Sequence, residues 1–181
     1  MCNTAILKDS DIVYAASLSA YGSMPATQWP SKGAIVELNV LWLTEEQLNI
    51  MHLTEAIGIA YDFVKLKPGT VKIKDFNYDK QIYGYVAISG VFPFHGSQPR
   101  RLSAINGKNL DLELFSEYEA LVYLKNKLGF KDKNLSQWIE IVIKDKSYRL
   151  DLHKTMRSCS IKPENPNWEV VNTSPKGELV L

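Results

Sequence analysis

A buried strand that leads straight into a capped helix is the feature that most constrains the fold of this 181-residue chain. The segment Ala34–Leu43 is almost continuously apolar, which is typical of a strand covered on both faces. Thr44 follows directly, and Gln47 stands three residues later. This spacing is a capping box, in which the two side chains bind free N–H groups at a helix start. We therefore predict a helix that begins at Glu45 and ends at Glu55 or shortly after it.

The apolar residues of this helix fall on two sides. At 100° per residue, one side holds Leu48, Met51, His52 and Glu55, and the other holds Leu43, Ile50, Leu53 and Ile57. Such a helix is expected to be largely buried. Glu55 then stands one turn beyond Met51, at a position where the pattern asks for a hydrophobic residue.

Two interpretations of Glu55 are open. A carboxylate held in an apolar place loses hydration, which raises its pKa toward neutrality and suits it to exchange protons as an acid and a base. The plainer interpretation is that Glu55 lies in the last helical turn, where its side chain bends out to solvent or pairs with a lysine. The helix pattern alone does not decide between them.

Strand patterns surround this helix. We predict a strand over Asp11–Leu18 and a turn over Pro30–Gly33. Three further strands follow the helix at Tyr61–Leu66, Thr70–Phe76 and Gln81–Ser89. The short separators between these three look like turns, so an antiparallel meander is the natural interpretation.

The second half of the chain has mainly helical patterns. Ser116 and Glu119 repeat the capping-box signature, and Gly129 marks the expected end of that helix. A further helix begins at Leu135, another covers Tyr148–Arg157, and a weak strand begins at Trp168. Together the patterns predict an α+β fold.

Composition excludes several classes of function. The 21 Lys and Arg residues balance 20 Asp and Glu residues, so we expect neither a nucleic-acid partner nor a membrane partner. No apolar run approaches the roughly 18 residues of a membrane span. The two cysteines and three histidines are scattered, so we expect no metal site and no cofactor. A cytoplasmic protein is the resulting expectation.

The stretch 36–64 resembles the centre of the gamma-glutamylcyclotransferase-like family. Members of that family have a strand, a short helix of the pattern L-T-x-E-x-L ending in a glutamate, a turn, a tyrosine and another strand. The matching positions here are Glu55, which the family uses as its catalytic acid and base, and Tyr61. The resemblance implies a small, mostly antiparallel, barrel-like mixed sheet with a few helices over residues 1–130. Residues 131–181 would then be a helical and extended tail packed on this domain.

One departure from the family concerns its hallmark loop, a Tyr-Gly-Ser-Asn-like segment after the first strand whose backbone N–H groups hold the substrate. Residues 1–10 contain no such loop, and Tyr21, Gly22 and Ser23 spell its first three residues closer to Glu55 than the family pattern implies. One interpretation, which we favour, is that the chain lacks the family's first strand. The other is that Tyr21, Gly22 and Ser23 themselves line the pocket.

The family reaction closes a gamma-glutamyl amine onto its own side-chain carbonyl, which yields 5-oxoproline and free amine without a metal or cofactor. The resemblance implies Glu55 as the catalytic residue, and substrate contacts from Tyr61, Tyr21, Gly22, Ser23 and His52. The alternative is a non-catalytic domain of the same fold that binds a small ligand or interacts with another protein. In that case the stripe of Leu135, Trp138, Ile139 and Val142 in the tail would bind a protein partner.

Overall fold

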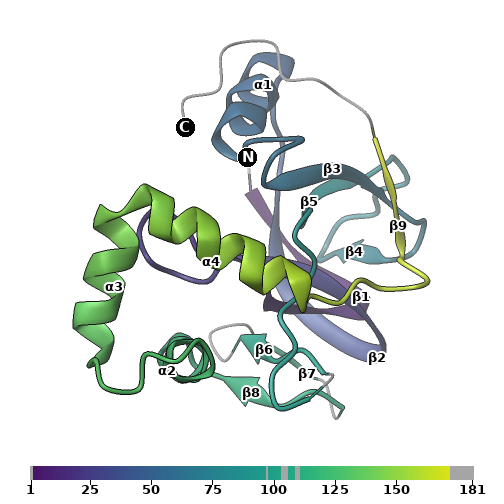
Figure 1. Ribbon diagram of the computed structural model, residues 1–181. Helices are drawn as coiled ribbons and strands as arrows, with labels where there is room; N and C mark the ends of the chain where they lie inside the picture. Colours follow the sequence, from purple (N-terminus) through teal and green to yellow (C-terminus); the bar gives the residue numbers. More distant parts are fainter. Residues whose placement is uncertain (1, 97, 103–105, 109–110, 172–181) are drawn as a thin grey trace.

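The computed structural model of the chain describes residues 2–96, 98–102, 106–108 and 111–171. These residues form an α+β structure with four helices and two sheets, which confirms the predicted class (Figure 1). The helices are α1 (Glu45–Thr54), α2 (Glu117–Lys127), α3 (Leu135–Lys144) and α4 (Lys146–Ser158). The strands are β1 (Cys2–Tyr14), β2 (Ala26–Leu41), β3 (Tyr61–Leu66), β4 (Val71–Ile73), β5 (Tyr83–Ala87), β6 (Arg101–Leu102), β7 (Gly107–Lys108), β8 (Leu114–Phe115) and β9 (Trp168–Val170).

A long antiparallel hairpin of β1 and β2 is the centre of the fold. Its register runs from the pair Cys2 and Leu41 to the pair Tyr14 and Ala26. The strand that the sequence predicts from Asp11 therefore begins nine residues earlier and ends four residues before Leu18. Pairing with the far half of β2 extends it, because that pairing supplies backbone partners that a local pattern does not reveal.

The turn predicted over Pro30–Gly33 lies inside the hairpin as an irregularity of β2. The register shifts between Lys8 and Ser10, so β2 carries extra residues opposite Asp9. Gly33 has a φ of 78°, and its N–H donates to Asp9 Oδ1 at 2.8 Å. The turn chemistry of these residues thus produces a bulge rather than the end of a strand.

The strands form two sheets among the described residues and do not close into a barrel. The larger sheet has the order β7-β2-β1-β6-β8, with β4 also paired to β1, and only β6 and β8 are parallel. The smaller sheet has the order β5-β3-β9. The predicted meander is therefore wrong, because β4 leaves its neighbours in sequence and pairs with Ala5, Ile6 and Leu7 of β1.

Helices α2, α3 and α4 lie together on one side of the molecule, away from α1 (Figure 1). The main core joins them to the end of the hairpin, and its members include Tyr14, Leu124, Trp138 and Met156. Within the described residues, no helix combines the length and apolar content needed to cross a membrane. The tail after residue 130 contributes to the core through α3 and α4 and to the smaller sheet through β9.

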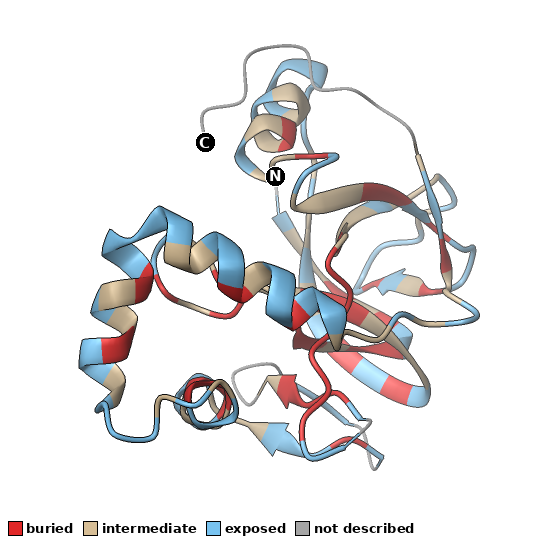
Figure 2. Ribbon diagram, in the orientation of Figure 1, coloured by how far each residue is buried: buried red, intermediate tan, exposed pale blue. Residues whose placement is uncertain are grey.

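Helix α1 is much less buried than its two apolar sides predict. His52 is its one buried residue, and Ile50 is 60 % exposed (Figure 2). The reason is that the contacts of α1 come mainly from His52, which meets Phe63 of β3 and Tyr85 of β5, while Leu48 and Met51 line a cavity. The prediction of a largely buried helix is therefore wrong.

Candidate functional site

The position of Glu55 is set by the helix that it ends. The capping box of Thr44 and Gln47 starts α1 as predicted, with the N–H of Gln47 donating to Thr44 Oγ1 at 3.2 Å. Glu55 is the C-cap residue, and its backbone N–H donates to the carbonyl of Met51 at 2.8 Å. Its side chain is half-buried, because the helix packs against β3 and β5 on this side.

A tight turn after Glu55 brings Tyr61 back to the helix end. Ala56 and Gly58 have φ values of 48° and 80°, and the N–H of Gly58 donates to the carbonyl of Tyr61 at 2.9 Å. The Tyr61 hydroxyl donates to the carbonyl of Ala26 at 3.2 Å. Tyr61 therefore connects the end of α1 to the first residue of β2.

Strands β3 and β5 present an aromatic face to α1. Phe63 pairs directly with Tyr85, and residues opposite one another in an antiparallel pair share a face. The ring of His52 packs edge-on against Phe63, with 4.6 Å between ring centroids. His52 Nδ1 lies 2.9 Å from the Tyr85 hydroxyl. The side chains of His52 and Tyr85 are thus held in place by each other and by Phe63.

The environment shifts the ionisation of all four groups near the helix end. Burial raises the pKa of Glu55 above its ordinary value of 4.5. Burial first, and then the negative charge of Glu55, raise the pKa of Tyr61 and of Tyr85 to about 12. Burial lowers the pKa of His52 below 6.5. At neutral pH the two tyrosine hydroxyls within range of the Glu55 charge, and His52, are therefore uncharged.

A cavity of about 540 Å³ adjoins this cluster. Its wall consists of residues from β2, α1, β3 and β5 and from the segments beside them, and most of them are apolar or aromatic. Tyr85 belongs to both places, because its ring is part of the wall and its hydroxyl binds His52. Glu55, Tyr61 and His52 are not among the described residues of the wall. The cavity and the Glu55 cluster therefore share Tyr85, whose hydroxyl is close enough to Glu55 for the carboxylate charge to raise its pKa.

Tyr21, Gly22 and Ser23 form a separate turn against α3. A Cβ atom on Gly22 would lie 2.8 Å from the side chain of Ile139, and Tyr21 is 86 % exposed. The backbone N–H groups of all three residues donate to Ser19: those of Tyr21 and Ser23 to its hydroxyl and that of Gly22 to its carbonyl. In this conformation the three N–H groups are used inside the turn and are not directed at a ligand.

Sequence reasoning brings together three of the residues that meet here, and it misses the fourth. His52, Glu55 and Tyr61 come from one continuous stretch, and the structure gathers them at the end of α1. The fourth residue, Tyr85, is not among the site residues predicted from the sequence, although it contacts His52 and lines the cavity. The alternating Tyr83, Tyr85 and Ala87 in a strand expected to pair with Tyr61–Leu66 is the signal that could have found it.

The described residues contain no group of three or more His, Cys, Asp or Glu side chains placed to hold a metal ion. Comparisons with protein-family models, with curated proteins and with solved structures give no match to this chain.

Proposed function

We propose that this protein cyclises a gamma-glutamyl amine to 5-oxoproline and free amine, and that Glu55 is the acid and base of the reaction. The observation that carries the proposal is the half-buried carboxyl group of Glu55, whose pKa is raised at a helix end between two protonated tyrosines. A raised pKa lets a carboxyl group accept a proton at a higher pH than an ordinary glutamate does, which suits it to act first as a base and then as an acid. The fold proposed with it is that of the gamma-glutamylcyclotransferase-like family.

The chemistry needs one base and one acid in sequence. Glu55 takes a proton from the α-ammonium group of the substrate, since only the neutral amine is a nucleophile. The amine nitrogen then forms a bond to the side-chain carbonyl carbon, and the amide bond from that carbon to the leaving nitrogen breaks. Glu55 returns its proton to the leaving nitrogen, and the second proton that the attacking nitrogen loses passes to the leaving nitrogen by the same route, so that 5-oxoproline keeps one N–H and the amine leaves as an ammonium ion. Because both reacting groups belong to one molecule, holding them in place supplies about 7 kcal/mol or more of the acceleration.

The neighbouring residues position Glu55 and the substrate in this proposal. Tyr61 is anchored by its bond to the carbonyl of Ala26, and Tyr85 is anchored by His52. Both hydroxyls keep their protons at neutral pH, so they contribute dipoles beside the carboxyl group and no competing charge. His52 is uncharged and acts through Tyr85 as a positioning residue.

The test is the formation of 5-oxoproline from gamma-glutamyl amines and gamma-glutamyl amino acids. We expect turnover by the wild type and its loss in Glu55→Gln, by about 100-fold or more, because the amide cannot transfer the proton. Glu46→Gln is the matched control, since Glu46 is an exposed carboxylate in the first turn of the same helix. Equal activity of the wild type and Glu55→Gln would refute the assignment.

A second candidate function is ligand binding without catalysis. Two observations favour it: Glu55 lies outside the cavity wall, and the N–H groups of Tyr21, Gly22 and Ser23 are donated to Ser19. A folded wild-type protein that binds a ligand and forms no 5-oxoproline from any gamma-glutamyl compound would favour this candidate.

A further inference from the structure

We propose that the cavity beside α1 binds an uncharged small molecule that carries an aromatic ring. In the reaction proposed above, this molecule would correspond to the amine part of the substrate. Only this assignment of the cavity to the amine part rests on the proposed function. The binding site itself stands on the composition of the cavity wall, on its aromatic residues and on the space within it.

The wall has no charged side chain among the described residues that form it. Leu7, Leu38, Leu48 and Met51 are representative of its apolar part. A charged ligand would lose its hydration here without gaining an ion pair, which costs several kcal/mol. The volume of about 540 Å³ lies within the range of small-molecule sites. The wall therefore selects an uncharged ligand of moderate size.

Aromatic side chains from separate segments meet at one part of the wall. Trp42 packs edge-on against Tyr78, with 4.7 Å between ring centroids, and its indole N–H is fixed by Asn3 Oδ1 at 2.7 Å. Phe76, whose ring contacts Trp42, lies outside the wall and is 52 % exposed. Rings placed in this way offer both faces and edges to another ring, which is worth about 0.5–1.5 kcal/mol per pair beyond area burial. This arrangement favours an aromatic group in the ligand.

Several polar atoms of the wall are bound by the protein itself, whereas the Asn39 side chain and the hydroxyls of Tyr78 and Tyr83 make no hydrogen bond among the described residues. The side-chain N–H groups of Gln28 donate to Ser10 and Asn167, and those of Gln81 donate to the carbonyls of Leu66 and Ile82. The Thr27 hydroxyl accepts the backbone N–H of Ala87 at 2.9 Å. These groups are therefore not available to anchor a strongly polar ligand.

Open space reaches the backbone of β5. Gly84 is part of the wall, and a Cβ atom built on it would have no heavy atom within 4 Å. A larger side chain at this position of the wall would therefore enter open space without a clash. Tyr85 lines the same cavity, and its hydroxyl contacts His52 and lies within range of the Glu55 charge. A substrate with its reacting carbonyl near Glu55 would place its amine part beyond Tyr85, in the cavity.

The test uses the uncharged fluorophore N-phenyl-1-naphthylamine, which brightens in apolar surroundings. We expect saturable binding of one probe per chain to the wild type. Gly84→Leu fills the site and Leu48→Glu places a charge in its wall, so each should weaken binding about ten-fold or more. Ile50→Glu is the matched control on the exposed side of α1 and should leave binding unchanged. Two wall variants are used so that one of them still tests the site if the other fails to fold.

Absence of saturable binding to the wild type, or binding that neither wall variant weakens, would overturn the site. The assignment of the cavity to the amine part of the substrate is tested by 5-oxoproline release from gamma-glutamyl anilide and gamma-glutamyl methylamide. We expect a KM for the anilide about ten-fold lower, and expect Gly84→Leu to remove the difference. Equal KM values for the two amides would overturn this assignment. Probe binding without turnover of either amide would support the site and refute the reaction, so the two failures are distinguishable.

Discussion

Glu55 owes its properties to a position that combines a helix end with a partly closed environment. The backbone of α1 fixes its Cα through the bond from its N–H to the carbonyl of Met51. The aromatic face of β3 and β5 then removes part of the hydration of its carboxyl group. The same residue on an exposed turn of the helix would keep an ordinary pKa, because water would stabilise its charge.

The raised pKa of Glu55 gives a prediction for stability. The folded protein binds the proton of Glu55 more tightly than the unfolded chain does, so the contribution of this group to stability falls as the pH rises from 4.5 through the raised pKa. We therefore expect Glu55→Gln to be at least as stable as the wild type at about pH 7, and the difference to vanish below 4.5. Urea unfolding at several pH values measures this. A wild type that gains stability over Glu55→Gln as the pH rises would contradict it.

A buried ion pair supplies a second prediction at the scale of residues. Arg101 Nε lies 2.8 Å from Asp11 Oδ2, and both side chains are almost fully buried. Arg101→Met would remove the cation that faces the Asp11 charge in the interior, which should lower the free energy of unfolding by about 3–5 kcal/mol. Lys144→Met is the control, because it removes an exposed pair with Glu140. Equal effects of the two substitutions in denaturant unfolding would show that burial does not matter here.

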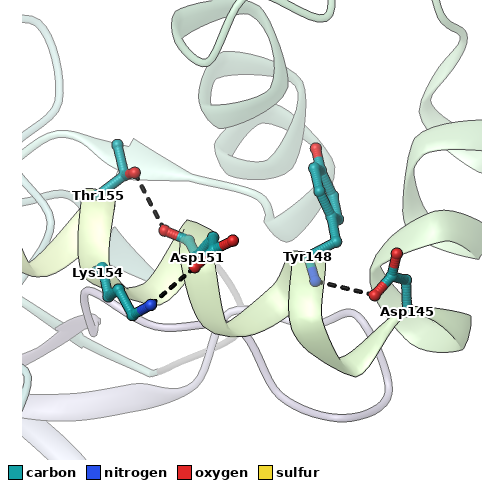
Figure 3. A network of polar contacts seen from close by, with 5 residues as sticks. All are labelled: Asp145, Tyr148, Asp151, Lys154 and Thr155. Atoms are coloured by element: carbon teal, nitrogen blue, oxygen red, sulfur yellow. Dashed lines mark hydrogen bonds and ion pairs between the residues drawn. The ribbon is translucent and has the colours of Figure 1, made fainter.

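At the scale of elements, the helix starts are set by local chemistry. The side chain of Asp145 begins α4 by accepting the N–H of Tyr148 at 2.9 Å, whereas Asp151 makes an exposed pair with Lys154 (Figure 3). We expect Asp145→Ala to destabilise the protein by about 1 kcal/mol. Asp151→Ala should have little effect, since exposed ion pairs contribute little. Thermal unfolding of both variants checks this, and a larger loss in Asp151→Ala would contradict it.

The sequence predicts these elements well because their signals are local. The capping boxes at Thr44, Ser116 and, in the structure, Asn134 each mark a helix that forms at that place. Strand partners are a different matter, because they depend on residues far away in the chain. The short strand β4 follows β3 in sequence and yet pairs with β1, where Ile73 is buried opposite Ala5. Local turn signals do not contain that preference.

The same difference between local and long-range signals applies to the residues of the candidate site. His52 and Glu55 share one helix and Tyr61 follows after one turn, so a local pattern brings all three together. Tyr85 reaches the site only through the register of β3 and β5, which a single sequence does not display. The family motif is matched in sequence by Tyr21, Gly22 and Ser23. In the structure, however, the N–H groups of these residues donate to Ser19 within the same turn.

At the scale of the whole molecule, one core connects the hairpin with the helices of the tail. Met156 of α4 is fully buried in the cluster that holds Tyr14 from the end of β1. Met156→Ala should therefore lower the free energy of unfolding by about 2–5 kcal/mol and shift one common transition. Leu150→Ala, on the exposed side of α4, should shift it much less. Fluorescence and circular dichroism following separate transitions would show that the tail unfolds independently.

The most direct test of the account is the pKa of Glu55 in the folded protein. Carboxyl ¹³C chemical shifts, measured by NMR over a pH titration and assigned by comparison with Glu55→Gln, report this value. We predict a titration midpoint above 4.5 for the Glu55 carboxyl group, because burial disfavours its charged form. A midpoint at or below 4.5 would mean that the carboxyl group is fully hydrated or paired with a cation, and it would contradict the proposed role of Glu55.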